Sequence, residues 1–130
     1  MIEVSELIGV YHADGGLIGE LAYLIGKARG AAHCGLCDVT HRGVRRKREW
    51  DDMVAATGVP FRLVHLNERD ADVEHASRAH TPCVLARTAS GLVLLLGPVD
   101  VDRCDGDVGT FAAALRAAAA DRGLLLPHLA

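Results

Sequence analysis

The segment H-C-G-L-C-D-V-T-H, residues 33 to 41, gathers four side chains that can bind a metal or carry out redox chemistry. Cys34 and Cys37 form a C-x2-C pair, and a histidine stands at each end of the segment. Mixed thiolate and imidazole ligands are typical of zinc sites, and the C-x2-C spacing allows two thiolates to meet one ion. The segment therefore predicts a zinc site, with iron or Cu(I) as less favoured occupants.

Helix geometry limits which of these side chains can be ligands together. On a continuous helix all four would share one face, but His33 and His41 would be separated by roughly 12 Å. One zinc ion, with bonds of about 2.0 to 2.3 Å, cannot span that distance. We therefore predict three local ligands, Cys34, Cys37 and His41, with His33 as the fourth ligand or a neighbour. Other donors in the chain are His12, Asp14, His65, His80 and Cys83.

The same two cysteines allow a second interpretation, a thiol–disulfide redox pair. A helix N-terminus and neighbouring arginines both lower the pKa of a thiol and so favour its reactive thiolate form. Arg42, Arg45 and Arg46 follow the pair closely. In a reducing compartment paired cysteines usually bind metal or do redox work. Zinc binding, redox exchange and plain structural packing of Cys34 and Cys37 all remain open at this point.

Residues 42–48 form a strongly basic run that predicts a third kind of function. A basic helix over this run would serve as a binding module for an acidic partner, phosphate or nucleic acid. However, three acidic residues follow directly, and Trp50 is the only aromatic residue nearby. A solvated helix face is therefore the preferred interpretation, and nucleic-acid binding is disfavoured. The basic residues are Arg42, Arg45, Arg46, Lys47 and Arg48.

The chain as a whole has 130 residues, of which 50% are hydrophobic, and a formal net charge of −3. This length fits a single domain over residues 1–130. The mild negative charge gives no general attraction to nucleic acid or anionic membranes. No apolar run approaches the roughly 20 residues of a membrane helix, and the start lacks the basic residues of a secretory signal. We therefore expect a cytoplasmic protein with no membrane partner.

The apolar pattern predicts strands and helices that alternate along the chain. Gly58 and Pro60 end a helix that contains Trp50, and Asp107 caps the last helix. This order predicts an α/β fold around a mixed sheet. The predicted strands are 2–11, 61–66, 82–87 and 92–97, and the predicted helices are 17–28, 68–79 and 108–122, with a further helical segment around residues 33–57.

The predicted order resembles the thioredoxin-like fold, in which β-α-β is followed by α and then by β-β-α. In this comparison the helical segment around residues 33–57 is an insertion. Thr81-Pro82, just before the third strand, resembles the cis-proline of that fold. The resemblance implies a mixed sheet with β-α-β-α-β-β-α order and a cis peptide bond before Pro82.

The segment Y-H-A-D-G-G, residues 11–16, is similar to the start of the small DCC-type thiol–disulfide oxidoreductases. In that family an aromatic residue, Asp and Gly are followed by a Cys pair. Here Leu17, Ile18 and Gly19 stand at those positions, and the pair is found later in the chain, at Cys34 and Cys37. The resemblance implies thiol–disulfide chemistry, with a cysteine pair relocated along the sequence.

Overall fold

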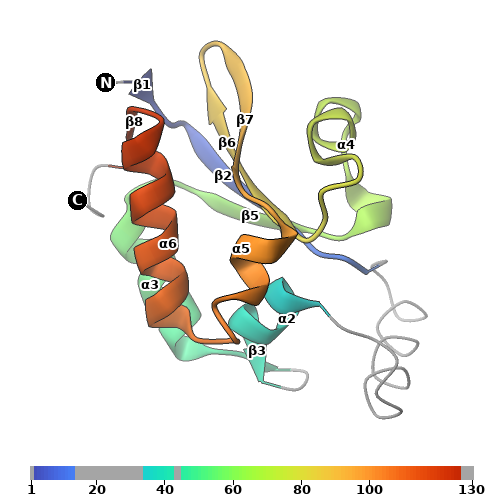
Figure 1. The fold of residues 1–130 in the computed structure, drawn as a ribbon, viewed down its shortest axis with the longest axis vertical. Helices are drawn as coiled ribbons and strands as arrows, with labels where there is room; N and C mark the ends of the chain where they lie inside the picture. The colour runs from blue at the N-terminus through green and yellow to red at the C-terminus, as the bar shows by residue number, and fades with distance from the viewer. Residues whose placement is uncertain (1, 14–33, 43–44, 127–130) are drawn as a thin grey trace.

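The computed structural model describes residues 2–13, 34–42 and 45–126 (Figure 1). A four-stranded sheet forms its centre, with the strand order β5-β2-β6-β7. β2 runs parallel to β5 and antiparallel to β6, and β6 runs antiparallel to β7. The fold is therefore mixed α/β around a mixed sheet, as the sequence predicts. The strands are β2 (Glu6–Val10), β5 (Phe61–Val64), β6 (Cys83–Thr88) and β7 (Gly91–Leu96).

Helices connect and cover these strands, and two short strand pairs lie outside the central sheet. β1 (Ile2–Glu3) pairs in parallel with β8 (Leu124–Leu125), and β3 (His41–Arg42) pairs antiparallel with β4 (Arg45–Arg46). In the described part of the chain, no helix is long and apolar enough to cross a membrane. The helices are α2 (Gly35–Thr40), α3 (Arg48–Thr57), the short 3-10 turn η1 (Leu66–Glu68), α4 (Ala71–Ser77), α5 (Pro98–Asp102) and α6 (Val108–Asp121).

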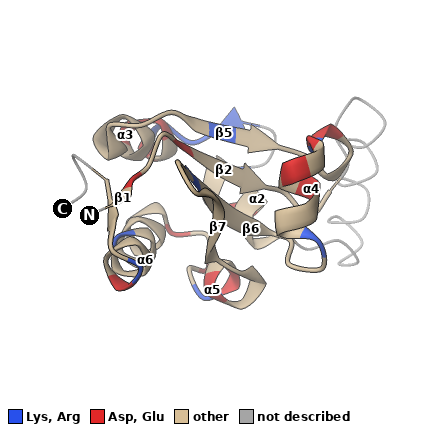
Figure 2. Ribbon diagram, turned by 90° about the horizontal axis from the view of Figure 1, so that it is seen from above, with Lys and Arg blue, Asp and Glu red and all other residues tan. Residues whose placement is uncertain are grey.

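The sheet buries both of its faces, because successive side chains of a strand point to opposite sides. Leu7 of β2 belongs to the larger apolar cluster, which α2, α3, α5 and α6 complete. Ile8 belongs to the smaller cluster, which packs against Val73 of α4. Figure 2 shows α3 and α6 far from α4, with the sheet between them. The large cluster is centred on Trp50 and Phe111, whose ring centroids are 5.3 Å apart.

Several local predictions are confirmed by the backbone. Gly58 ends α3 with a φ of 75°, in the left-handed region that favours glycine. Asp107 caps α6, because its carboxylate accepts a hydrogen bond from the Thr110 backbone N–H at 2.8 Å. The peptide bond between Thr81 and Pro82 is cis. The helix predicted over 17–28 lies outside the described residues.

The segment 33–57 is only partly helical, and the prediction of a basic helix over 42–48 is wrong. α2 ends at Thr40, β3 and β4 form an antiparallel pair, and α3 begins at Arg48. A physical reason lies in the charges: on a helix Arg42 would face Arg45 and Arg46 at the i+3 and i+4 positions, where like charges destabilise. The short helix α5 and the pairing of β1 with β8 are further elements that the apolar pattern did not predict.

Candidate functional site

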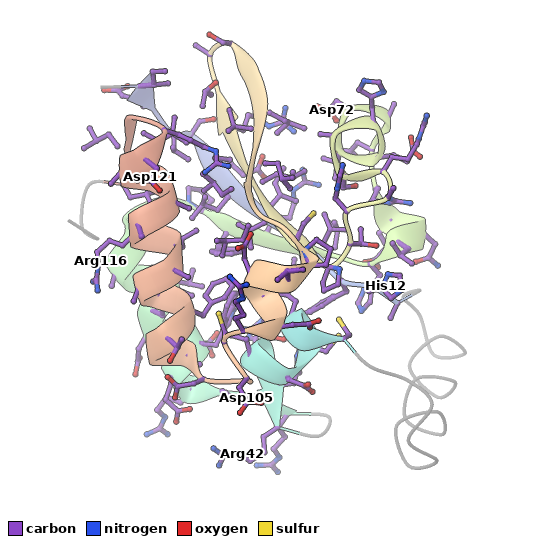
Figure 3. The ribbon with its side chains drawn as sticks, viewed as in Figure 1. His12, Arg42, Asp72, Asp105, Arg116 and Asp121 are labelled. Atoms are coloured by element: carbon purple, nitrogen blue, oxygen red, sulfur yellow. The ribbon has the colours of Figure 1, made fainter. Side chains whose placement is uncertain are left out.

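The cysteine pair lies at the start of α2, beside the end of β2. Cys34 is the N-cap of α2, and its Sγ accepts a hydrogen bond from the Cys37 backbone N–H at 3.4 Å. The backbone N–H of His12, which follows β2 almost directly, donates to the same sulfur at 3.4 Å. Figure 3 shows His12 near the start of α2. The fold therefore brings Cys34 next to the residues that follow β2.

These donors stabilise the thiolate form of Cys34. The hydrogen bond with the Cys37 side chain lowers the pKa of Cys34 most, and burial opposes it. The backbone N–H groups of His12, Cys37 and Leu36 lower the pKa further, so that it falls to about 7 from an ordinary value of 9.0. Near neutral pH the thiol and thiolate forms of Cys34 therefore coexist.

The two cysteines differ in accessibility. Cys34 is fully buried, with 0% of its surface exposed, whereas Cys37 is half-buried. Neither cysteine forms a disulfide. A molecule that approaches the pair from outside therefore meets Cys37, and the stabilised thiolate lies behind it.

Two glycines allow α2 to lie close to its neighbours. A Cβ atom on Gly9 would lie 2.8 Å from Cδ2 of Leu63 and 3.2 Å from Cδ2 of Leu36. A Cβ atom on Gly35, inside the C-x2-C motif, would lie 2.5 Å from Oδ1 of Asp102. Neither position accepts a side chain without movement of α2 or its surroundings. The position of the cysteine pair thus depends on close packing against β2, β5 and α5.

A chain of hydrogen bonds holds the other end of α2. The Tyr11 hydroxyl and Thr40 Oγ1 are 2.9 Å apart, and Thr40 Oγ1 is 2.6 Å from Nδ1 of His41. Burial raises the pKa of Tyr11, and negative charge on Cys37 and Cys34 raises it as well. Tyr11 therefore stays a neutral phenol. His41, a predicted zinc ligand, has its Nδ1 engaged by Thr40.

The residue before the cis-proline also reaches this site. Nδ1 of His12 and Oγ1 of Thr81 are 2.8 Å apart. The site thus includes Tyr11, His12 and Thr81, none of which the spacing of the cysteines could identify. The signal that was available is the Y-H pair directly after the first strand, because residues at the carboxyl end of a central strand commonly line a site.

Of the four predicted zinc ligands, the structure describes Cys34, Cys37 and His41. Among residues 2–13, 34–42 and 45–126, no group of three or more His, Cys, Asp or Glu side chains is placed to hold a metal ion. His33 and Asp14 lie outside these ranges. Of the other predicted donors, His65 contacts Oε1 of Glu68 at 2.7 Å and His80 is exposed after α4. The zinc site therefore stays a prediction.

Cys83 lies apart from the pair, on the opposite face of the sheet. It belongs to the smaller apolar cluster with Ile8, Val10 and Leu85. Burial raises its pKa to about 12, and the charge of Arg69 opposes this shift. Cys83 is therefore an apolar core residue, and the structure does not bring it to Cys34 and Cys37.

Comparison of the chain with protein-family models, with curated proteins and with solved structures finds no match. Function is therefore inferred from the geometry and chemistry of the site.

Proposed function

We propose that this chain is a thioredoxin-like thiol–disulfide oxidoreductase whose redox pair is Cys34 and Cys37. The observation that carries the proposal is the environment of Cys34 Sγ at the N-cap of α2. This sulfur accepts hydrogen bonds from the backbone N–H groups of His12 and Cys37, each at 3.4 Å. Such donors stabilise a thiolate. The thiolate is both the nucleophile and the leaving group in thiol–disulfide exchange.

The order of the elements supports the thioredoxin-like part of the proposal. β2 is followed by α2 and α3, then by β5, α4, β6, β7 and α6. With the β3–β4 pair and α5 set aside, this order resembles the β-α-β-α-β-β-α order of that fold. The cysteine pair lies at the start of α2, in contact with His12, which follows β2. A reducing, cytoplasmic location belongs to the same proposal, because the pair must be kept available as thiols.

In the proposed reaction Cys37 attacks first, because it is the more exposed sulfur. It passes its proton to the Cys34 thiolate as its own sulfur attacks a partner disulfide. A mixed disulfide forms between Cys37 and one partner sulfur, and the other partner sulfur leaves as a thiolate. Cys34 then loses its proton to water and attacks Cys37, which releases the second partner thiolate. Two electrons thus pass from the pair to the partner, and a Cys34–Cys37 disulfide forms.

The reverse reaction explains why the stabilised thiolate is the buried one. A thiolate of a reducing partner attacks the accessible Cys37 sulfur of the oxidised pair, and Cys34 is the leaving group. A thiol of lower pKa leaves faster. The hydrogen-bond donors around Cys34 therefore favour reopening of the disulfide.

The direct test is equilibration of the protein in glutathione buffers of graded redox potential. We expect a reversible disulfide between Cys34 and Cys37, located by mass spectrometry after alkylation of the remaining thiols. Cys83 and Cys104, both buried, should stay alkylatable thiols after unfolding. If Cys34 and Cys37 remain thiols at every potential, or if either pairs with Cys104, the proposed function is wrong.

Zinc binding is a second proposal for the same segment, with Cys34, Cys37 and His41 as ligands and His33 as a fourth ligand or neighbour. The donors around Cys34 favour it too, because a cysteine binds zinc as a thiolate. Elemental analysis of protein purified without a metal-affinity tag tests it. Stoichiometric zinc that is lost in Cys34→Ser and kept in Cys104→Ser would support a metal site. Metal-free protein whose melting curve does not respond to added zinc would exclude it.

A further inference from the structure

A basic surface continues directly from the helix that carries the cysteine pair. We name it the basic hairpin, and it consists of β3, β4 and the two residues that follow: Arg42, Arg45, Arg46, Lys47 and Arg48. We propose that the basic hairpin binds an acidic segment of the protein that exchanges disulfides with Cys37, an inference that rests on the proposed function. The partner class is thus a protein with acidic residues near its reactive cysteine.

Three guanidinium groups of the basic hairpin are available to such a partner. Arg42, Arg45 and Arg48 are exposed, and none of them forms an ion pair within the described part of the chain. Arg46 instead contacts Asp51 at 2.8 Å. Lys47 donates from Nζ to the carbonyl oxygen of Gly106 at 2.6 Å. Positive charge is therefore concentrated here, and among the described residues no acidic side chain pairs with Arg42, Arg45 or Arg48.

The positions of these arginines oppose local stability. Arg42 and Arg45 stand directly opposite each other in the β3–β4 register, and like charges directly opposite across a strand pair are destabilising. Arg48 is the first residue of α3, where the helix dipole disfavours a cation. A bound carboxylate would relieve both repulsions. This charge arrangement fits anion binding better than it fits stabilisation of the fold.

The backbone fixes the basic hairpin to the redox site. The His41 N–H donates to the Cys37 carbonyl oxygen at the end of α2. The Lys47 N–H donates to the Thr40 carbonyl oxygen at 2.8 Å. Cys37 and His41 are therefore about one helical turn, roughly 5.4 Å, apart. Because an extended chain spans about 3.3 Å per residue, a carboxylate a few positions from the partner cysteine can reach the hairpin.

The surroundings favour an acidic peptide over nucleic acid. Glu49, Asp51 and Asp52 are exposed near the start of α3, and a long phosphate backbone would meet their negative charges. Trp50 is 2% exposed, so it offers no surface on which a base could stack. Figure 2 shows that acidic residues are distributed over the helices α4, α5 and α6 as well. A short run of carboxylates can bind to the basic hairpin alone, without contact with these acidic residues.

The test is direct binding of a fluorescein-labelled peptide of six glutamates that contains no cysteine, measured by fluorescence anisotropy. We expect salt-sensitive binding that the triple substitution Arg42→Gln, Arg45→Gln, Arg48→Gln weakens about tenfold, the effect of three surface ion pairs. The matched control replaces Arg103, Arg116 and Arg122 by Gln. It removes the same charge from the α5 and α6 side of the molecule, where Figure 3 shows Arg116 on the outer surface.

Because the peptide has no cysteine, this experiment succeeds or fails independently of redox activity. Equal binding of a six-glutamine peptide, or equal loss in the control variant, would overturn the inference. Tighter binding of a single-stranded oligothymidylate than of the glutamate peptide would overturn it as well. If the glutamate peptide binds as expected, a disulfide substrate flanked by glutamates should also react faster with wild type than its glutamine-flanked counterpart. That advantage should disappear in the triple variant.

Discussion

Cys34 and Cys83 are both fully buried beside the central sheet, yet their acidities are opposite. The pKa of Cys34 is lowered to about 7, whereas burial raises that of Cys83 to about 12. Both side chains are 0% exposed, so the extent of burial does not explain the difference. Cys34 receives N–H donors at a helix start, while Cys83 lies in an apolar cluster with Val10 and Leu85. Local hydrogen-bond donors, more than exposure, decide which buried cysteine becomes reactive.

The largest expected effect that separates the two cysteines is on thiol–disulfide exchange. Cys34→Ser should lower steady-state reduction of a disulfide substrate at least about 100-fold, because the mixed disulfide on Cys37 can no longer be resolved. The variant should also accumulate that mixed disulfide, which mass spectrometry of the quenched reaction would identify. Cys83→Ser, if folded, should keep its exchange rate within about twofold. Equal losses in both variants would contradict the distinction.

A second difference should appear in the pH dependence of stability. The folded pKa of Cys34, about 7, lies below its ordinary value of 9.0. Its contribution to stability is thus complete above about pH 9 and is lost as the pH falls through about 7. A shift of this size corresponds to about 2–3 kcal/mol. The stability gap between wild type and Cys34→Ser in urea denaturation should therefore widen by about that amount from about pH 6 to about pH 9.

The contribution of Cys83 to the free energy of unfolding should depend on pH in the opposite direction. Its folded pKa, about 12, lies above its ordinary value of 9.0, so the unfolded chain ionises first. Its contribution to stability is therefore present below about pH 9 and is lost as the pH rises from there toward 12. The gap between wild type and Cys83→Ser should stay constant between about pH 6 and about pH 8. A gap that widens over this range would contradict the assignment of Cys83 to the apolar core.

A smaller effect should come from the packing that holds the cysteine pair. Gly35→Ala would place a Cβ 2.5 Å from Oδ1 of Asp102, the end of a flexible side chain, and 3.3 Å from the Asp102 backbone N and Cα. The tight backbone contacts should cost about 1 kcal/mol of folding free energy. The substitution should also move Cys34 relative to the His12 N–H and raise the pKa of Cys34. Gly97→Ala is the matched control, because its Cβ would lie 3.8 Å from Asp100 Oδ2, an ordinary contact. Urea denaturation of both variants measures their losses of folding free energy. Equal losses in the two variants would mean that α2 is loosely packed.

The sequence predicted the sheet well because its signals are local. Strands β5, β6 and β7 coincide with short apolar runs of the sequence. Gly58 marks the end of α3, and Asp107 marks the start of α6. The basic run was less predictable. Residues 45–46 form a strand only because β3 lies opposite them, and a cross-strand partner of this kind leaves no periodic signal in so short a segment.

The site was predictable in part, because spacing identifies Cys34 and Cys37 but not what surrounds them. His12 donates to Cys34 across 22 positions of the chain, and Tyr11 reaches Thr40 across 29. Contacts over such distances follow from the order of strands rather than from any local pattern. Nothing in the local sequence pattern therefore indicates that Cys34 lies beside the residues that follow β2.

Near neutral pH a large share of Cys34 is the thiolate, because the Cys37 side chain and the backbone N–H groups of His12, Cys37 and Leu36 stabilise its negative charge. The most direct measurement is the ultraviolet thiolate absorbance of the reduced protein as a function of pH. We predict one ionisation near pH 7, as the pKa of Cys34 indicates, which is lost in Cys34→Ser and kept in Cys83→Ser. A wild-type protein with no thiolate ionisation below about pH 8.5, the region of an unperturbed thiol, would contradict the account.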